Sequence, residues 1–330
     1  MKFLVVGCGS IGKRHIRNLR SLGHKDILAC DIKKERLDEV KKYKVKTFDN
    51  LDNALKQKVD AVLICTPSSL HLQPSLLALE KGCHLFIEKP ISHTLNGLNE
   101  AIAISEERRL VTMVGFNLRF EKGLKTLKKL LDQNVVGKVT TAICIAGQYL
   151  PDQHPWEDYR YGYAANKSLG GGVILDGIHE MDYLSWFLGD VKEIVCFADK
   201  LSTLEMDTED STAVLLRFEK GEIGVIQMDY VKRAYERTCE IIGEEGIMKW
   251  DFKEHTVKLF SAKTKEWKTI QYDRKYDINQ MYVDEMKFFV ECVKGKEKPP
   301  VDALKGKKIL EVALAAKESV NTKRVVSLDS

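Results

Sequence analysis

The stretch that decides the fold is Lys2-Phe3-Leu4-Val5-Val6-Gly7-Cys8-Gly9-Ser10-Ile11-Gly12. The apolar run before Gly7 predicts a buried strand, and the residues after Gly12 carry apolar side chains at helical spacing. Glycines at this G-x-G-x-x-G spacing permit a tight turn, let the backbone approach a pyrophosphate, and let helix pack on strand. The free N–H groups of the helix N-terminus would then face phosphate. This stretch predicts a dinucleotide site at Gly7, Gly9, Ser10, Ile11 and Gly12.

The remainder of residues 1–120 repeats the same rhythm of short apolar runs and amphipathic helices. Such alternation is typical of βαβ units and a parallel sheet. The predicted strands are Lys2–Val6, Asp26–Asp31, Val45–Phe48, Asp60–Cys65, His84–Ile87 and Val111–Val114.

Asp31 ends the second predicted strand. A carboxylate at this place accepts hydrogen bonds from the adenosine ribose hydroxyls and repels a 2′-phosphate, which favours NAD as the cofactor. Lys33 and Lys34 follow closely and could pair with a 2′-phosphate. NADP is therefore the alternative.

After residue 120 the pattern changes to one helix, one long strand and then consecutive hairpins, which indicate an antiparallel sheet. The helix is Lys122–Leu131 and the strand Lys138–Ala146; the hairpins pair Thr212–Phe218 with Glu222–Tyr230, Thr238–Ile242 with Ile247–Phe252, and Thr256–Ser261 with Trp267–Tyr272. Two helices close the chain. We expect an α/β dinucleotide-binding domain over residues 1–120 and an α+β domain over 121–330, with the closing helices able to pack back on the first.

Composition excludes several classes of protein. Lys+Arg 52 against Asp+Glu 48 gives a net charge of +4, too small and evenly spread to indicate nucleic-acid binding. The apolar runs are strand-sized and the N-terminus lacks a cleavage pattern, so we expect neither a membrane span nor a signal peptide. The eight cysteines show no metal-ligand spacing, which predicts reduced thiols in the cytoplasm and no metal site.

Two further motifs follow predicted strands at the sheet edge where ligands bind. Thr66-Pro67-Ser68-Ser69, with His71 after it, follows the strand Asp60–Cys65. Glu88-Lys89-Pro90 follows the next strand. A lysine between an acid and a proline at a strand's end is unusual, and the alternative reading of Lys89 is an exposed loop lysine.

Together with Gly115–Phe120 and Gly170–Asp182, these motifs resemble the Gfo/Idh/MocA oxidoreductase family. The resemblance implies a Rossmann domain, a second domain with an open, mainly antiparallel sheet whose outer face forms a homodimer or homotetramer contact, and a cis Lys89–Pro90 bond. It also implies that cofactor is bound by Thr66, Pro67, Ser68, His71, Glu88, Lys89, Asn117 and Arg119.

The same resemblance implies the catalytic residues. Lys89 would donate to the substrate oxygen, His179 would be the acid/base, and Asp176 would orient or tune them. Histidine suits that role because its ordinary pKa of about 6.5 allows either protonation state near neutrality. The alternative is that His179 only caps a helix over Glu180–Leu188. Asp176 and His179 are three residues apart, whereas the family's commonest spacing is four, and at an expected strand-to-helix corner this departure bears most on Asp176.

Aromatic, acidic and basic side chains gather without helical period in residues 148–163. Such a mixture suits a sugar or nucleotide sugar, and the alternative is an ordered loop or a subunit contact. The predicted substrate-binding residues are Lys89, Tyr149, His154, Trp156, Tyr159, Arg160, Asp176 and His179.

These observations predict an NAD(P)-dependent oxidoreductase that moves a hydride between nicotinamide and a secondary alcohol or ketone of a sugar, polyol or nucleotide-linked sugar. Arg160 and Lys167 could bind phosphate, which favours the nucleotide sugar. A non-catalytic, dinucleotide-sensing regulator of the same fold is the alternative, and biliverdin-reductase-like chemistry is a third. Retention of both Lys89 and His179 favours the enzyme.

Overall fold

A computed structural model describes residues 1–272 and 276–328. The chain forms two compact units. Unit 1 comprises Met1–Asn117 and Ile278–Leu310, and unit 2 comprises Leu118–Asp277 and Glu311–Ser330. Residues 278–310 thus belong with the N-terminal residues rather than with the second domain, because α10 (Asn279–Val293) packs against α1 (Ser10–Ser21).

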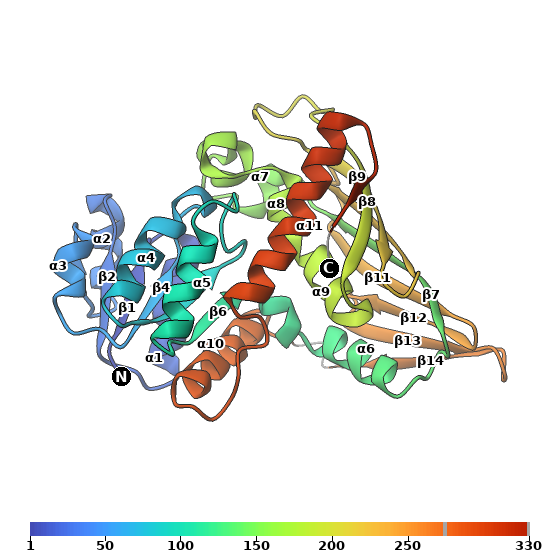
Figure 1. Cartoon of the computed structure of the whole chain (residues 1–330), viewed down its shortest axis with the longest axis horizontal. Helices are drawn as coiled ribbons and strands as arrows, with labels where there is room; N and C mark the ends of the chain where they lie inside the picture. The colour runs from blue at the N-terminus through green and yellow to red at the C-terminus, as the bar shows by residue number, and fades with distance from the viewer. Residues whose placement is uncertain (273–275, 329–330) are drawn as a thin grey trace. The chain divides into compact units, whose positions relative to one another are not determined.

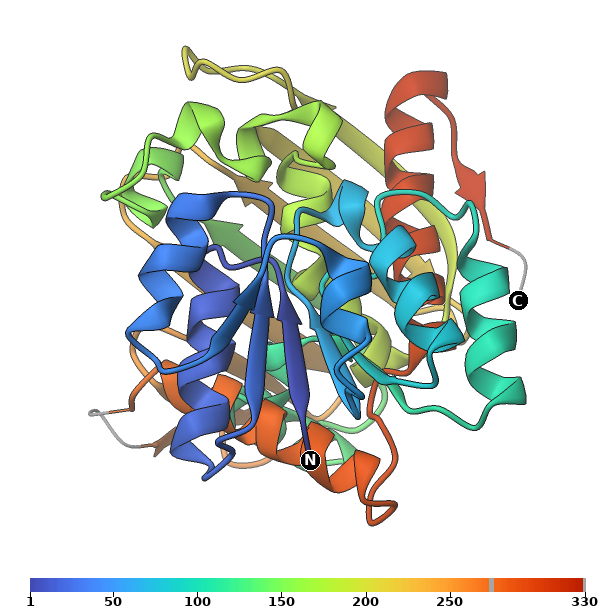
Figure 2. The same ribbon diagram turned by 90° about the vertical axis from the view of Figure 1, so that its left-hand side faces the viewer.

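Unit 1 is built on a six-stranded parallel sheet of order β3-β2-β1-β4-β5-β6. Four-residue stretches that are wholly buried form β1, β2, β4 and β6, which explains why apolar runs identified them. Figure 2 shows helices on both faces of this sheet. The strands are β1 (Phe3–Val6), β2 (Ile27–Cys30), β3 (Lys46–Phe48), β4 (Ala61–Ile64), β5 (His84–Glu88) and β6 (Thr112–Gly115); the remaining helices are α2 (Lys34–Lys41), α3 (Leu51–Leu55), α4 (Leu72–Glu80) and α5 (Leu98–Glu107).

Strand order reverses beside β1, since β2 and β4 flank it and lead to opposite edges of the sheet. In such sheets, ligands bind outside the carboxyl ends of the strands at this reversal. The motifs after β1, β4 and β5 all lie at that edge. The fold therefore places Gly7, Thr66 and Lys89 where a dinucleotide binds.

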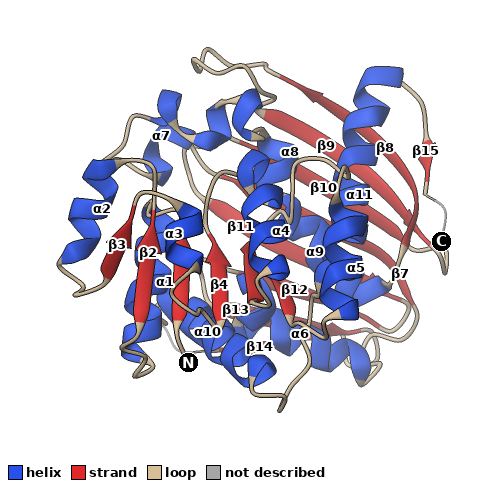
Figure 3. Cartoon of the chain, turned by 60° about the vertical axis from the view of Figure 1, so that its left-hand side comes forward, coloured by secondary structure: helices blue, strands red, loops and turns tan. Residues whose placement is uncertain are grey.

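Unit 2 is built on a nine-stranded sheet of order β14-β13-β12-β11-β7-β10-β9-β8-β15, antiparallel except for the β7–β10 pair (Figure 3). Its strands are β7 (Val139–Gly147), β8 (Val191–Asp199), β9 (Ser211–Phe218), β10 (Ile223–Asp229), β11 (Glu236–Gly243), β12 (Gly246–Asp251), β13 (Thr256–Ser261), β14 (Glu266–Gln271) and β15 (Val326–Ser327). The three predicted hairpins are present. Strand β8 was not predicted, because Lys192 and Glu193 interrupt its apolar alternation.

Three helices of unit 2, α6 (Lys122–Asp132), α8 (Val173–Asp176) and α9 (Ile178–Leu188), pack on one face of this sheet (Figure 1). Strand β9 shows the consequence, because its residues alternate between buried and exposed along the strand. Helix α7 (Leu150–Gln153) lies in the loop after β7, and α11 (Ala303–Thr322) begins in unit 1 and ends in unit 2. No helix in the described ranges is long and apolar enough to cross a membrane.

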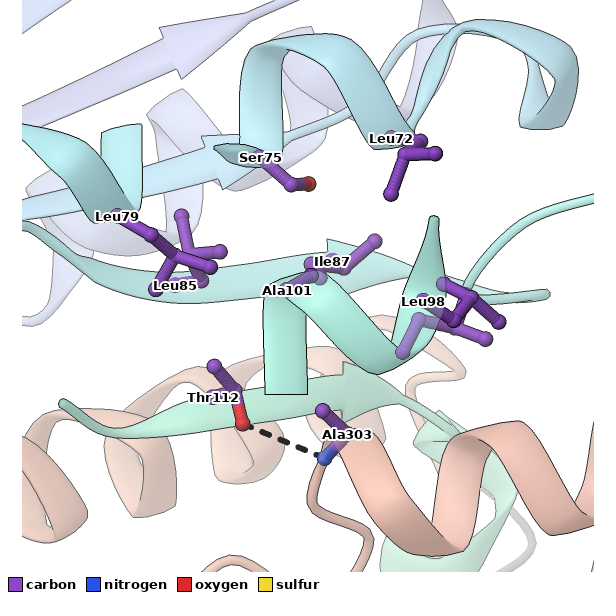
Figure 4. Close-up of a pocket in the computed structure, with 10 residues that line it drawn as sticks. Leu72, Ser75, Leu79, Leu85, Ile87, Leu98, Ala101, Thr112 and Ala303 are labelled. Carbon is purple, nitrogen blue, oxygen red and sulfur yellow. Dashed lines mark hydrogen bonds between the residues drawn. The ribbon is translucent and has the colours of Figure 1, made fainter. Parts of the chain in front are cut away.

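A small cavity in unit 1 lies among α4, α5, β5 and the start of α11 (Figure 4). Its volume is about 10 Å³, room for at most one water, and most of its lining is aliphatic. Thr112 Oγ1 accepts a hydrogen bond from the Ala303 amide at 3.3 Å at its edge. This cavity is a packing gap and not a substrate site.

Candidate active site

The glycine loop after β1 has the geometry of a phosphate cradle. Gly7 has φ +92°, and a side-chain carbon on it would lie 2.6 Å from the carbonyl oxygen of Cys65, while one on Gly12 would overlap the carbonyl of Gly7. A carbon on Gly9, by contrast, would meet nothing closer than Arg36 at 3.9 Å. Helix α1 begins at Ser10 with no side chain capping its first N–H groups. The loop thus leaves space and backbone donors for the pyrophosphate of a dinucleotide.

Asp31 follows β2 and anchors this loop. Its side chain is buried, with Oδ2 accepting from the Cys8 amide at 2.7 Å and Oδ1 from the Lys33 amide at 2.8 Å. Each carboxylate oxygen keeps a further lone pair for a ribose hydroxyl. Burial and the neighbouring Asp31 raise the pKa of Cys8 to about 12, so its thiol stays neutral and serves packing.

Arg36 is a functional candidate that the sequence did not single out. It lies on α2, with Nη1 3.7 Å from Asp31 Oδ2, and it is also the side chain nearest the open space above Gly9. Lys33 and Lys34, the basic residues that stood out, are exposed at the start of the helix. Arg36 follows Asp31 by five residues and lies in the first turn of α2. That spacing was the signal in the sequence that could have identified it.

This arrangement predicts how the carboxylate sets cofactor choice. The parent protein should bind NADH more tightly than NADPH. Asp31→Ala should reduce the ratio of the two affinities by about tenfold, because the carboxylate no longer repels the 2′-phosphate and Arg36 becomes available to bind it. Fluorescence titration measures the dissociation constants of NADH and NADPH. Adding Arg36→Ala to the variant should remove the gain in NADPH binding. Tighter NADPH binding by the parent would contradict this assignment.

The segment Glu88-Lys89-Pro90 ends β5. Lys89 is half-buried, and its bond to Pro90 is cis, as the resemblance implied. Glu88 Oε1 lies 2.6 Å from His15 Nε2, so this carboxylate is engaged within the protein. The chain thus presents a lysine side chain at the sheet edge where ligands bind in folds of this kind.

His71 is held by backbone carbonyls at both ring nitrogens. Its ring is 1% exposed, with Nδ1 2.8 Å from the Pro90 carbonyl and Nε2 2.8 Å from the Thr66 carbonyl. Burial lowers its pKa, and the two carbonyls and the charge of Glu88 oppose that shift. Both ring nitrogens are thus directed at the backbone after β4 and β5.

The other predicted cofactor residues differ in accessibility. Thr66 and Pro67 are partly exposed after β4, whereas Ser68 and Asn117 are buried. The Arg119 guanidinium makes a two-pronged pair with the buried Asp182, at 2.8–3.0 Å, and lies over the Trp186 ring. This pair holds one edge of the guanidinium against Asp182, and Arg119 stays a predicted cofactor residue.

In unit 2, Asp176 and His179 lie on two short helices joined at Gly177, rather than at a strand-to-helix corner. Asp176 accepts hydrogen bonds from the hydroxyls of Tyr163 and Tyr230, the latter at 3.0 Å. His179 is 6% exposed within the first turn of α9, where Gly177 is the N-cap residue. His179 is therefore not the helix cap that the alternative proposed.

Tyr163 and Tyr230 were missed as functional candidates. Burial raises the pKa of Tyr230, and the Asp176 carboxylate raises it further, so the hydroxyl keeps the proton that it donates. No spacing rule connects a tyrosine at the end of β10 to an acid 54 residues earlier. Tyr163 lay in the aromatic stretch, but nothing distinguished it from its neighbours.

The aromatic stretch folds into α7 and short 3₁₀ turns. Arg160 is paired with Asp158 at 2.7 Å and with Glu205 at 3.3 Å, and Tyr159 accepts from the Glu205 amide. The guanidinium of Arg233 covers one face of Tyr149. Several side chains here are exposed, among them Tyr161, at 82%, Trp156, at 69%, and His154, whose ring lies beside that of Trp156. Within residues 1–272 and 276–328, no cluster of three or more His, Cys, Asp or Glu side chains is arranged to hold a metal ion.

Comparisons with known proteins agree with this geometry. Residues 1–116 match the Gfo/Idh/MocA oxidoreductase family model for an NAD-binding Rossmann fold, and residues 124–249 match a C-terminal domain model of the same family. A myo-inositol 2-dehydrogenase from Thermotoga maritima is 30% identical, over 100% of this chain and 99% of its own. A scyllo-inositol 2-dehydrogenase (NAD(+)) from Bacillus subtilis is 27% identical, over 98% and 95%.

Among solved structures, the WlbA dehydrogenase from Bordetella pertussis, in complex with NADH and UDP-GlcNAcA, superposes with a TM-score of 0.83. The alignment covers 100% of this chain and 99% of that one at 20% identity, which shows a common fold. The family matches confirm the predicted oxidoreductase class, its NAD-binding domain and the two-domain fold. The chain belongs to the Gfo/Idh/MocA family of oxidoreductases.

Proposed function

We propose that this protein is an NAD-dependent dehydrogenase that oxidises a secondary alcohol of an inositol or a sugar, or reduces the corresponding ketone. The observation that carries the proposal is the placement of Lys89 at the same sheet edge as the open glycine loop and Asp31. A cation is thus presented beside a dinucleotide site. The named inositol dehydrogenases among the relatives support the substrate class.

NAD, when bound, supplies the acceptor for a hydride from the alcohol carbon. Lys89 donates a hydrogen bond to the alcohol oxygen, whose negative charge grows as its proton leaves. His179 takes the hydroxyl proton, and its neutral imidazole is the form able to do so. Asp176 acts as an orienting group, because the hydroxyls of Tyr163 and Tyr230 fix its carboxylate.

The pairing of Arg160 changes the preferred substrate. Its guanidinium faces two carboxylates, so its charge is already compensated within the chain. That compensation weakens the sequence argument for a phosphate-bearing nucleotide sugar. An uncharged polyol, an inositol first of all, is therefore favoured over a nucleotide-linked sugar.

A substrate panel tests the proposal. The protein with NAD is mixed separately with myo-inositol, scyllo-inositol, free hexoses and UDP-linked sugars, and reduction is followed by absorbance of the nicotinamide. We expect turnover with an inositol or a free sugar, and turnover slower by about two to four decades from the Lys89→Met variant. Tight NADH binding with no turnover of any alcohol, or of the ketones with NADH, would instead favour the dinucleotide-sensing regulator.

We also propose that the protein forms a homodimer or homotetramer through the face of the nine-stranded sheet opposite α6, α8 and α9. Register aligns Val195, Leu215, Val225 and Ile143 in one row across four strands, and Leu215 is 50% exposed. An apolar row of this kind is suited to burial against a second copy. Sedimentation velocity tests this, and a monomer at micromolar concentration would refute it.

All eight cysteines are buried and free, which supports a cytoplasmic location.

A further inference from the structure

Two buried histidines flank the segment that carries Lys89 in unit 1. His15 contacts Glu88, the residue before the lysine, and His71 contacts Pro90, the residue after it. The chemistry proposed above uses neither ring. We infer that His15 and His71 are positioning residues that fix the Lys89 amine relative to the dinucleotide loop, an inference that rests on the proposed catalytic role of Lys89.

His71 connects the ends of two neighbouring strands. Its two ring nitrogens lie 2.8 Å from the carbonyl oxygens of Pro90, which follows β5, and of Thr66, which follows β4. A neutral imidazole donates to one of these carbonyls, and an imidazolium donates to both. In either form the rigid ring spans the two segments and limits how far they can move apart.

His15 connects the same segment to the phosphate-binding helix. It lies in α1, three residues beyond Gly12, is 0% exposed, and has Nε2 2.6 Å from Glu88 Oε1. The edges of Phe86 and Tyr282 pack against its ring, with centroids 5.1 and 6.4 Å away. The imidazole is thereby held in one orientation, and it couples the glycine loop to the strand that ends at Lys89.

Such coupling matters because hydride transfer depends steeply on geometry. A misplacement of about 1 Å in a reacting or stabilising group can lower turnover by about 100-fold. The two histidines contact Glu88, Pro90 and Thr66, and neither lies within 4 Å of a side-chain carbon placed on Gly9. Their loss should therefore displace Lys89 while leaving dinucleotide binding close to normal.

The first test measures the lysine itself and needs no substrate. The full chain, saturated with NADH, is treated with trace acetic anhydride, and acetylation of Lys89 is read by peptide mass spectrometry against the exposed Lys81. We expect His71→Leu and His15→Leu to raise Lys89 acetylation by about threefold or more, since a released amine becomes more accessible. NADH affinity should stay within about threefold.

His84→Leu is the matched control. His84 lies at the opposite end of β5, is half-buried, and accepts a hydrogen bond from the Val111 amide at 2.9 Å. It should leave Lys89 acetylation unchanged. His71→Gln and His15→Gln retain one N–H donor and should fall between the leucine variants and the parent, and they replace those variants if either fails to fold. Unchanged Lys89 acetylation, or equal changes in His84→Leu, would overturn the inference.

The second test separates this inference from the proposed function. With the alcohol that turns over fastest in the panel, His71→Leu should lower kcat about 10- to 100-fold, and adding it to Lys89→Met should cause no further loss. If His71→Leu lowered kcat in the Lys89→Met background by as much as it does in the parent, His71 would act independently of Lys89, and the inference would be overturned. If Lys89→Met alone kept parental turnover, the proposed function would fail, while the acetylation result would still decide whether the histidines position the lysine.

Discussion

Lys89→Met is expected to lower kcat by about two to four decades while leaving NADH affinity within about threefold of the parent. Methionine keeps most of the volume of the lysine stem and removes the ammonium. A preorganised cation stabilises the oxygen more strongly in the transition state than in the ground state, so the loss appears in turnover rather than in binding. Steady-state kinetics on the best alcohol of the panel, with NADH titration of the same preparation, measures both quantities.

Lys89→Arg provides the charge-conserving control. Its planar guanidinium cannot place a compact charge at the same point, so only partial rescue is expected. Either of two results would show that Lys89 has no catalytic role. One is turnover of Lys89→Met within a few-fold of the parent, and the other is a large loss of NADH affinity in that variant. The second would indicate that the amine binds cofactor phosphate instead.

His179→Ala is expected to have the second large effect, a fall in kcat of about two to four decades with NADH affinity nearly intact. The group lost is the proposed proton acceptor, which belongs to unit 2, whereas the glycine loop and Asp31 belong to unit 1. pH–rate profiles add a second readout, because the limb that reports titration of the base should disappear with the imidazole.

His154→Ala is the matched control for His179→Ala, since His154 is an exposed histidine of the same unit whose ring lies beside Trp156. It should keep the parental pH profile and alter KM at most. Near-normal turnover of His179→Ala would leave this histidine as a buried residue of α9 with no part in proton transfer.

Local patterns explain which features were predictable. The glycine loop, Asp31 and the Glu88-Lys89-Pro90 segment each depend on a strand end and a few adjacent residues, and apolar runs locate those ends because the strands are buried on both faces. Strand β8 was not predicted, because charged residues at its start interrupt the alternation of apolar and polar side chains. Sequence periodicity is therefore most informative for the central strands of unit 1.

Partners distant in sequence explain what was missed. The pairing of Arg119 with Asp182, 63 residues away, was not predicted, and the two hydroxyls that donate to Asp176 come from two separate segments. Side-chain pairing of this kind depends on how β10, α8 and α9 pack, and no single-sequence signal encodes it. The motif identified Asp176, but the two tyrosine hydroxyls that donate to it could be identified only from the tertiary structure.

The return of residues 278–310 to unit 1 has a consequence for biosynthesis. Phe289 of α10 packs edge-on against Phe86 of β5, and Asn279 donates to Asn18 of α1. When residues 1–117 have left the ribosome these contacts cannot yet form, so the side of Phe86 that Phe289 covers stays open while about 160 further residues are translated. The N-terminal domain is thus the first to be started and among the last to be completed, and a fragment that ends near residue 120 lacks part of its own core.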